Sequence, residues 1–383
     1  MRIANPPDRK PAELLWFALL GVGMLVGLFA FSYILINGHS HEFNAPWKPS
    51  WGILISTYEL FVLLSVGLCL VGAIGNLAGL PGREAYMPRG VQVAALALFM
   101  GVGTVSIELT HPMRLTFDSL ARREFVAAIE VSVCFYGLYL IWLGGEYLAL
   151  LQRARLLSLL LALGAWATAM AAIYRMDTGL GLFGAVDFWH GSFFLVHSTL
   201  SALVLGGALY PQVILLGQWL RGGEMSTPVE KSLEGMRRFQ VLMILLLMAY
   251  VLVSMAAGSF LASPATARAT ASLMAGPLSV NFWLFELGIG MLLPVFLLLS
   301  RSRCSPVRVG LAGLLAIVGQ FFMHYDRVIV AQLASLPEGA PTEGLGLTSY
   351  LPCLPKVSAV LGALSLFLFL WSFLEKMRPQ DAD

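Results

Sequence analysis

The chain has 383 residues, of which 58% are apolar and 12% are charged, and its net charge is +2. Soluble proteins carry about 25% charged residues, so this composition excludes a soluble globular fold, and the small net charge gives no reason to expect a nucleic-acid partner. The four cysteines form no Cys-x-x-Cys pair, so we expect neither an iron–sulfur cluster nor a zinc site in the chain.

Ten segments are long and apolar enough to cross a bilayer, which requires about 20 apolar residues each. In chain order they are 14–36, 51–75, 89–110, 124–150, 156–175, 189–217, 237–262, 281–300, 307–330 and 355–375. The first follows a weakly basic N-terminus and is too long for a signal-peptide core, so we expect it to be retained. The sequence therefore predicts an all-α polytopic membrane protein with about ten transmembrane helices.

Basic residues predict the orientation of these spans. With the N-terminus inside, the cytoplasmic segments hold 16 Lys and Arg residues and the opposite side holds seven. By the positive-inside rule, both termini are predicted to lie in the cytoplasm. The longest outer segments are then 37–50, 111–123, 176–188, 263–280 and 331–354. The last is either a docking surface or a solvated connector.

Four pairs of landmarks indicate an internal repeat of spans two to five in spans six to nine. The pairs are Trp51 and Trp189, Pro112 and Pro264, Glu130 and Glu286, and Tyr174 and Tyr325. Units four helices apart share one direction, so this is a parallel repeat. We predict a first four-helix bundle over 51–188 and a second over 189–354. They are flanked by a first span with its outer loop, 1–50, and a last span with its tail, 355–383.

Ionisable side chains in and beside the spans gather in the outer half, and such groups are functional hypotheses by default because they are costly in lipid. They are Glu59, Glu108, His111, Arg114, Glu130, Arg175, Asp177, His190, His197, Glu286, His324, Asp326 and Arg327. In the cytoplasmic half the only comparable ionisable residue is Glu146, which we expect at the level of the lipid headgroups. A transporter or channel needs polar groups along the whole crossing, whereas a site open to one face needs them only there.

Structural roles stay open for most of these groups. They are ion pairs between helices for Arg175–Asp177 and Asp326–Arg327, an interfacial position for His190, and packing for His197. Glu59 differs from the others because its own span contains no basic residue that could neutralise it. We therefore regard Glu59 as the strongest functional candidate.

The outer polar groups fit a site for a quinone headgroup. Such a site needs hydrogen-bond partners for two carbonyls, a titratable group that moves protons, and an apolar path from the lipid. The first bundle supplies these groups from three spans: Tyr58, Glu59, His111 and Glu130. No metal is required, and a cofactor-bearing partner at the outer face would have to carry the electrons.

Three other functions stay open. A proton-translocating module would need a polar continuation to Glu146 or to hydroxyl groups in the inner half. A haem b anchor could use His197 and His324 for one outer haem, but two stacked haems would need histidine pairs at both depths. A secondary transporter is disfavoured by the nearly empty cytoplasmic half.

Several motifs carry a resemblance to a known family. They are Trp51-Gly-Ile-Leu-Ile-Ser-Thr-Tyr58, His111-Pro112 with Arg114, Trp189-His190-Gly, and Phe282-Trp283-x-x-Glu286 with Pro294. In this order, over residues 50–375, the chain resembles the NrfD/PsrC (polysulfide-reductase-like) membrane subunits. Tyr350-x-Pro352 is similar to the tail of the longer, ten-helix members. Where the family often has Arg-x-Asn near the end of the ninth span, this chain reads His324-Tyr325-Asp326-Arg327.

The resemblance implies a quinone-binding subunit of a respiratory complex, with menaquinone or ubiquinone as bound substrate and without haem or metal of its own. It also implies partners: a periplasmic [4Fe–4S] ferredoxin-like subunit together with a molybdopterin enzyme, a hydrogenase or multihaem cytochromes c. The implied quinone site comprises Trp51, Tyr58, Glu59, His111, Arg114 and Glu130, with Glu59 as the proton-handling group. A proton-conducting or degenerate counterpart comprises Arg175, Asp177, His190, His197, Glu286, His324, Asp326 and Arg327.

Overall fold

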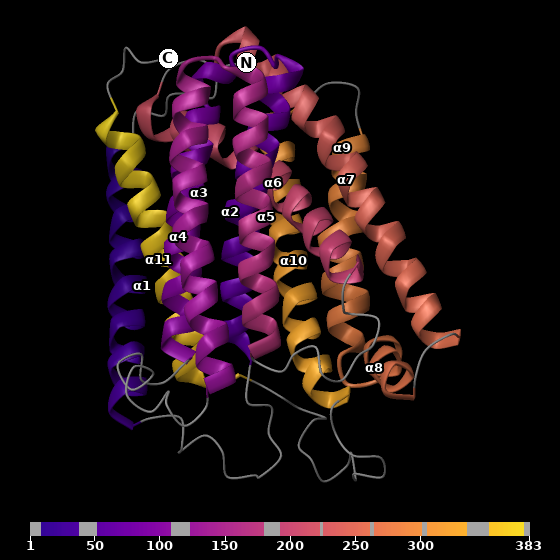
Figure 1. Ribbon diagram of the computed structural model, residues 1–383. Helices are drawn as coiled ribbons and strands as arrows, with labels where there is room; N and C mark the ends of the chain where they lie inside the picture. The colour runs from indigo at the N-terminus through magenta and orange to yellow at the C-terminus, as the bar shows by residue number, and fades with distance from the viewer. Residues whose placement is uncertain are drawn as a thin grey trace.

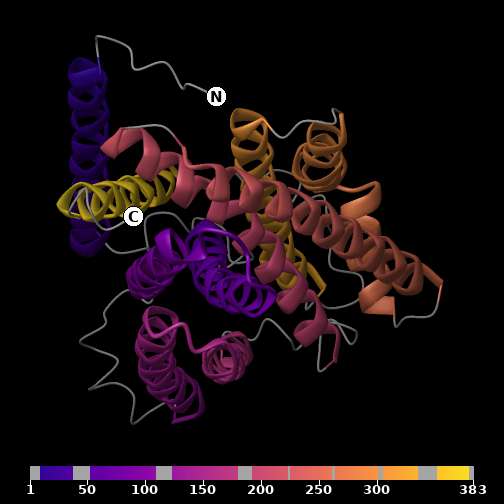
Figure 2. The ribbon, with the colours of Figure 1, turned by 90° about the horizontal axis from the view of Figure 1, so that it is seen from above.

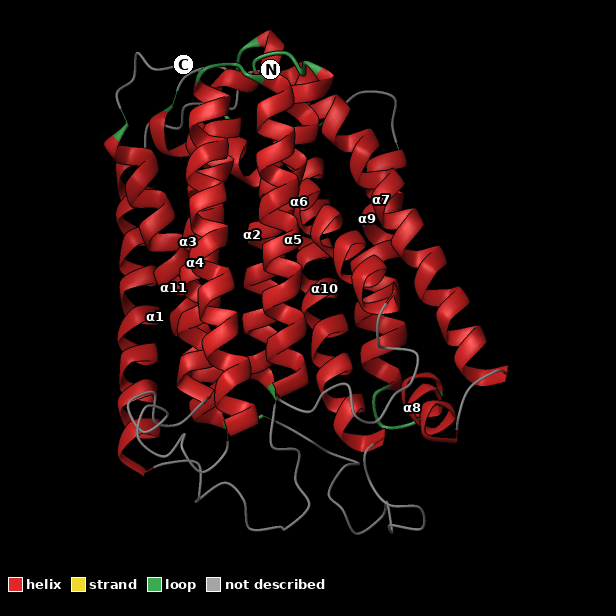
Figure 3. Ribbon diagram, viewed as in Figure 1, coloured by secondary structure: helices red, strands yellow, loops and turns green. Residues whose placement is uncertain are grey.

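All elements of the computed structural model are helices (Figures 1 and 3). The structure describes residues 9–37, 52–108, 123–179, 192–222, 225–260, 264–300, 305–334 and 352–378. The helices are α1 (Arg9–Asn37), α2 (Ile53–Ala78), η2 (Arg83–Ala85), α3 (Met87–Glu108), α4 (Arg123–Leu151), α5 (Arg155–Gly179), α6 (Ser192–Arg221), α7 (Thr227–Phe260), α8 (Pro264–Met274), η5 (Asn281–Leu292), α9 (Leu293–Leu299), α10 (Pro306–Ala334) and α11 (Leu354–Met377). Within these ranges ten helical segments are long and apolar enough to span a membrane, which confirms the predicted fold class.

The spans form two bundles and a flanking pair. Helices α2 to α5 pack together, α6, α7, η5 with α9, and α10 pack together, and α1 packs along α11 at one edge of the molecule (Figure 2). Lys376 Nζ lies 2.7 Å from a carboxylate oxygen of Glu13, which places the end of α11 beside the beginning of α1. We call this end of the molecule the terminal face and the opposite end the loop face.

The two bundles meet along α2 and α6, which are the first helices of the two predicted repeats. Helix α2 is the most enclosed of the described spans. Within the 18-residue stretch that qualifies it as a span, 89% is buried inside the protein. A Cβ atom on Gly67 would collide with the Ala202 carbonyl oxygen, and one on Gly206 would collide with the backbone of Gly67. Two helix backbones can come this close only at glycine, which has no side chain. The crossing of α2 and α6 therefore determines how the two bundles pack against each other.

Two features of the second bundle differ from the prediction. The segment 263–280, expected to be a loop, contains α8, which begins at Pro264, a residue favoured in the first turn because it needs no hydrogen-bond partner there. The eighth span begins as the π-helix η5. Pro294 follows it and has no N–H to donate to the backbone of the preceding turn. Gly290 in η5 packs directly on Gly319 of α10.

Candidate functional site

Four ionisable side chains from three helices meet where the two bundles join, near the loop face. The Arg327 guanidinium on α10 lies 2.6 Å from Glu59 Oε1 on α2 and 2.8 Å from Asp177 Oδ2 on α5. His324 Nδ1, also on α10, lies 3.2 Å from Glu59 Oε2. Glu59, Asp177 and His324 are fully buried. We call these four residues the junction cluster.

The surrounding helices explain why Glu59 needs partners from elsewhere. Glu59 is on the second turn of α2, about 9 Å along the helix from Ile53. Because α2 is enclosed on all sides, the carboxylate cannot reach the headgroups, and a buried charge is tolerated only when it is paired. Arg327 provides the positive charge, and His324, three positions earlier, lies on the same side of α10.

A pair of tyrosines adjoins the junction cluster. The hydroxyl groups of Tyr58 on α2 and Tyr136 on α4 are hydrogen-bonded, and their rings meet edge to face at 6.4 Å. Both side chains are buried. Tyr136 was not predicted as a site residue. Tyr136 lies six positions from Glu130 and therefore on a different side of α4, and nothing in the sequence pointed to Tyr136.

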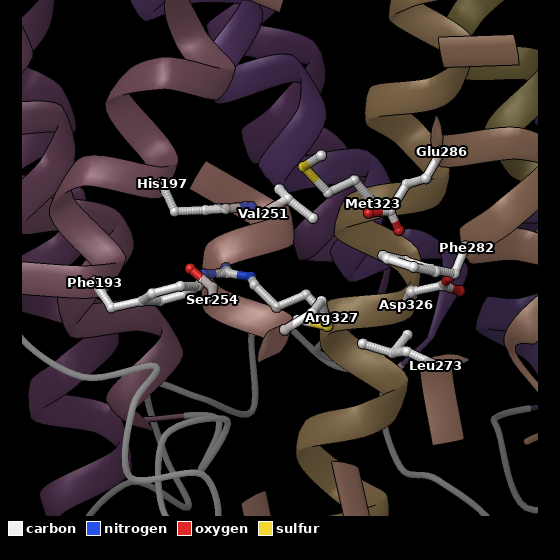
Figure 4. A pocket seen from close by; sticks show the side chains of 11 residues that line it. Phe193, His197, Val251, Ser254, Leu273, Phe282, Glu286, Met323, Asp326 and Arg327 are labelled. Carbon is white, nitrogen blue, oxygen red and sulfur yellow. The ribbon is translucent and has the colours of Figure 1, made fainter. Parts of the chain in front are cut away.

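A small cavity of about 40 Å³ lies on the second-bundle side of Arg327 (Figure 4). Its polar lining residues are His197, Ser254, Glu286, Asp326 and Arg327. This volume suffices for water but not for an aromatic headgroup. Among the side chains that the structure describes, His197 Nδ1 and His324 Nε2 are buried without a hydrogen-bond partner. His197 lines the cavity, so its imidazole can bind a water molecule there.

The two histidines continue the polar path from the junction cluster into the second bundle. Their rings meet edge to face at 6.1 Å, and His197 stacks on Phe193 at 5.5 Å. His197 follows Trp189 by eight positions, as Glu59 follows Trp51, so the predicted repeat makes these two residues equivalent positions of α6 and α2. A carboxylate in one bundle is thus matched by an imidazole in the other.

Ion pairing between helices, one of the structural roles left open by the sequence, is present and joins Asp177 to Arg327. Arg327 pairs with Asp177 and Glu59 rather than with its neighbour Asp326, whose Oδ1 accepts a hydrogen bond of 2.8 Å from Asn281 Nδ2. Adjacent residues on a helix point in different directions, which separates Asp326 from Arg327. Asp177 likewise bonds across to α10, and its predicted partner Arg175 lies half-buried on α5.

The remaining predicted residues divide into three groups. Glu286 and Asp326 line the far side of the cavity, where Figure 4 shows them near Phe282. Glu130 is exposed on α4 and does not join Tyr58 and Glu59. The residues outside the described ranges are Trp51, His111, Arg114 and His190.

The terminal half of the first bundle is more polar than expected. Glu146, which we expected at the headgroups, is fully buried in α4, and the Cys69 thiol of α2 donates a hydrogen bond to it. Cys69 lies about 14 Å from the end of α2. Nearer the loop face, Ser65 Oγ and the Tyr139 hydroxyl are 2.7 Å apart. The expectation of a nearly empty half was therefore wrong, because sequence spacing does not reveal which side of α4 faces α2.

Two further buried ion pairs attach α11 to the bundles. At the terminal face, Arg89 Nε on α3 donates to Glu375 Oε1 over 2.9 Å. At the loop face, Lys356 Nζ donates to Glu108 Oε1 over 2.9 Å. Each pair joins α3 to α11 rather than to the junction cluster, so we regard both as structural.

The sequence matches no protein-family model and no curated protein. The resemblance to the NrfD/PsrC subunits accordingly stays a prediction that rests on the motifs described above. In the described part of the chain, no group of three or more His, Cys, Asp and Glu side chains is arranged to hold a metal ion.

Proposed function

We propose that this protein is a quinone- or quinol-interacting membrane subunit of a respiratory electron-transfer complex. The observation that carries the proposal is the junction cluster. It combines a fully buried carboxylate, Glu59, with an arginine and an imidazole, beside a hydrogen-bonded tyrosine pair. A cluster so costly to bury is usually retained for function, and these groups suit the binding of carbonyl oxygens and the transfer of protons.

The residues fit the needs of a quinone headgroup. Tyr58 and Tyr136 supply hydroxyl groups for one carbonyl, and the His324 imidazole can serve the other. When bound, the quinone would accept or release two electrons, and Glu59 would exchange the accompanying protons. The cavity beside Arg327 has room only for water, so we place the headgroup on the Tyr58 side and assign the cavity to proton exchange.

The proposed partners follow from this chemistry. The chain supplies groups that bind and move protons, and electrons would come from a partner subunit at the loop face. A periplasmic [4Fe–4S] protein, joined to a molybdopterin enzyme, a hydrogenase or multihaem cytochromes c, has the required properties. This arrangement corresponds to a loop face on the periplasmic side of the inner membrane, with both termini in the cytoplasm.

The test is Glu59→Gln, compared with Glu108→Gln as a matched control. Both residues are buried carboxylates paired with a cation near the loop face, but only Glu59 belongs to the junction cluster. We expect Glu59→Gln to lower quinone-linked electron transfer by at least about 100-fold per assembled complex, because the proton acceptor is lost. Glu108→Gln should keep most of the activity. Full turnover in Glu59→Gln would remove this residue from the mechanism.

A second candidate function is proton translocation driven by the complex, which the buried Glu146 favours. Ser65 with Tyr139, and Cys69 with Glu146, continue along α2 and α4 from the tyrosine pair toward the terminal face. Such hydroxyl, thiol and carboxyl groups can pass protons when water connects them. Proton uptake at the terminal face during turnover in liposomes, followed with an enclosed pH dye, tests this function.

A further inference from the structure

A large apolar cavity of about 780 Å³ lies between the flanking pair α1/α11 and helix α3. It is separate from the junction cluster. Its walls run from Gly21 to Leu35 on α1, from Met100 to Ile107 on α3 and from Ala359 to Leu366 on α11. The cavity has the volume of a small-molecule site, yet it lies within the membrane-spanning part of the protein.

The residues that line the cavity are almost all apolar, so the cavity suits a hydrocarbon chain. The two hydroxyl groups among the lining residues are already used, because Thr104 Oγ1 donates to the Gly101 carbonyl over 2.8 Å and Ser106 Oγ donates to the Val102 carbonyl over 2.7 Å. Neither hydroxyl therefore has a hydrogen left to donate to a quinone carbonyl. An apolar cavity of this kind takes up apolar ligands.

The packing of α1 explains why the cavity exists. Helix α1 touches α11 backbone to backbone, since a Cβ atom on Gly27 would collide with Gly362. This contact sets the position of α1, and the described part of the protein does not cover the side of α1 that faces α3. The leucines of α1 that line the cavity, Leu25 and Leu28, are 68% and 60% exposed.

The length of the cavity indicates which molecule binds in it. The lining of α1 covers 14 residue steps, or about 21 Å, and begins two residues before the end of the helix at the loop face. Half of a bilayer is about 20–22 Å thick when its headgroup region is counted, and about 15 Å of this is hydrocarbon. A single chain that descends from a headgroup at the loop face to the bilayer centre therefore matches the cavity in depth and in chemistry.

We infer that this cavity binds one acyl chain of a phospholipid, which fills the space between α1 and α3 and completes the packing of the flanking pair. The lipid headgroup would lie at the loop face. The site does not depend on the proposed quinone function, because none of its residues belongs to the junction cluster or to the tyrosine pair.

Two glycines in opposite walls allow a sharp test. Both glycines line the cavity, and a Cβ atom on Gly21 or on Gly103 meets nothing within 4 Å. We therefore use Gly103→Leu and Gly21→Leu to add a side chain to each wall. Gly137 on α4 is equally unobstructed but does not line the cavity, so Gly137→Leu is the matched control. Each variant adds the same side chain to a membrane-spanning helix.

The experiment measures lipid bound to full-length protein purified from membranes in a mild detergent. Native mass spectrometry counts the retained phospholipids, and the delipidated protein is then titrated with palmitoyl-oleoyl phosphatidylglycerol. We expect wild type and Gly137→Leu to retain one tightly bound phospholipid. In Gly103→Leu and Gly21→Leu its apparent affinity should fall by about tenfold or more, because the added side chain overpacks the site.

Three results would overturn the inference. One is equal lipid affinity in wild type and both cavity variants, and another is an equal loss in Gly137→Leu. The third is recovery of a quinone rather than a phospholipid as the molecule displaced by Gly103→Leu. The Glu59→Gln variant should keep the bound phospholipid, so failure of the lipid site and failure of the quinone proposal can be told apart.

Discussion

Removing the arginine of the junction cluster should destabilise the protein more than removing it together with its two carboxylate partners. Arg327 is the cation for both Glu59 and Asp177, at 2.6 and 2.8 Å. Breaking a buried ion pair by deleting one partner costs about 3–5 kcal/mol, because the remaining charge is left uncompensated. Two carboxylates lose their partner in Arg327→Met, so we expect about 5 kcal/mol. The triple variant Glu59→Gln/Asp177→Asn/Arg327→Met should lie within about 2 kcal/mol of wild type.

The assay is the free energy of unfolding in mixed micelles, obtained from far-UV circular dichroism during titration with SDS. A second measurement follows the pH dependence of Arg327→Met. The loss of unfolding free energy in this variant, relative to wild type, should become smaller as the pH falls from about 8 to about 5. Protonation then neutralises the uncompensated carboxylates. The reasoning fails if the triple variant is no more stable than Arg327→Met, or if the single substitution costs less than about 1 kcal/mol.

Two further predictions concern the backbone contact between the bundles and the buried carboxyl of the terminal half. Gly206→Ala should lower the unfolding free energy by about 3 kcal/mol, because the added methyl group would meet the backbone of Gly67. Gly137 has open space around it, so Gly137→Ala should change the unfolding free energy by less than about 0.5 kcal/mol. Equal stability of the two variants in the SDS titration would contradict the proposed crossing. Glu146→Gln should abolish proton uptake at the terminal face in liposomes while quinone-linked electron transfer continues. Unchanged uptake would leave Glu146 with a structural role.

The spans were predictable because the property that defines them is local. A run of about 20 apolar residues is required by the thickness of the hydrocarbon core, whatever the run packs against. The segment 307–330, for example, corresponds to α10 from Pro306 to Ala334. Helix α8 escaped prediction because its Ala- and Thr-rich sequence is too short and too polar to resemble a span.

The partners of the site residues were not predictable in the same way. Glu59, Asp177 and Arg327 were each recognised as costly groups in lipid, but the sequence did not identify which of them pair with one another. The actual partners are distant: Asp177 and Arg327 are 150 positions apart. Which side of a helix faces which neighbour depends on packing over the whole molecule, and this also explains the errors over Glu146 and Glu130.

The dependence of two early carboxylates on one late arginine has a consequence for biogenesis. Ribosomes add about 5–20 residues per second, so Arg327 is made roughly 8–30 s after Asp177. During this interval the first bundle must accommodate Glu59 and Asp177 without their cation, either protonated or held near water at the insertion machinery. The first half of the chain therefore cannot mature by itself, and its final closure has to wait for synthesis of the second half.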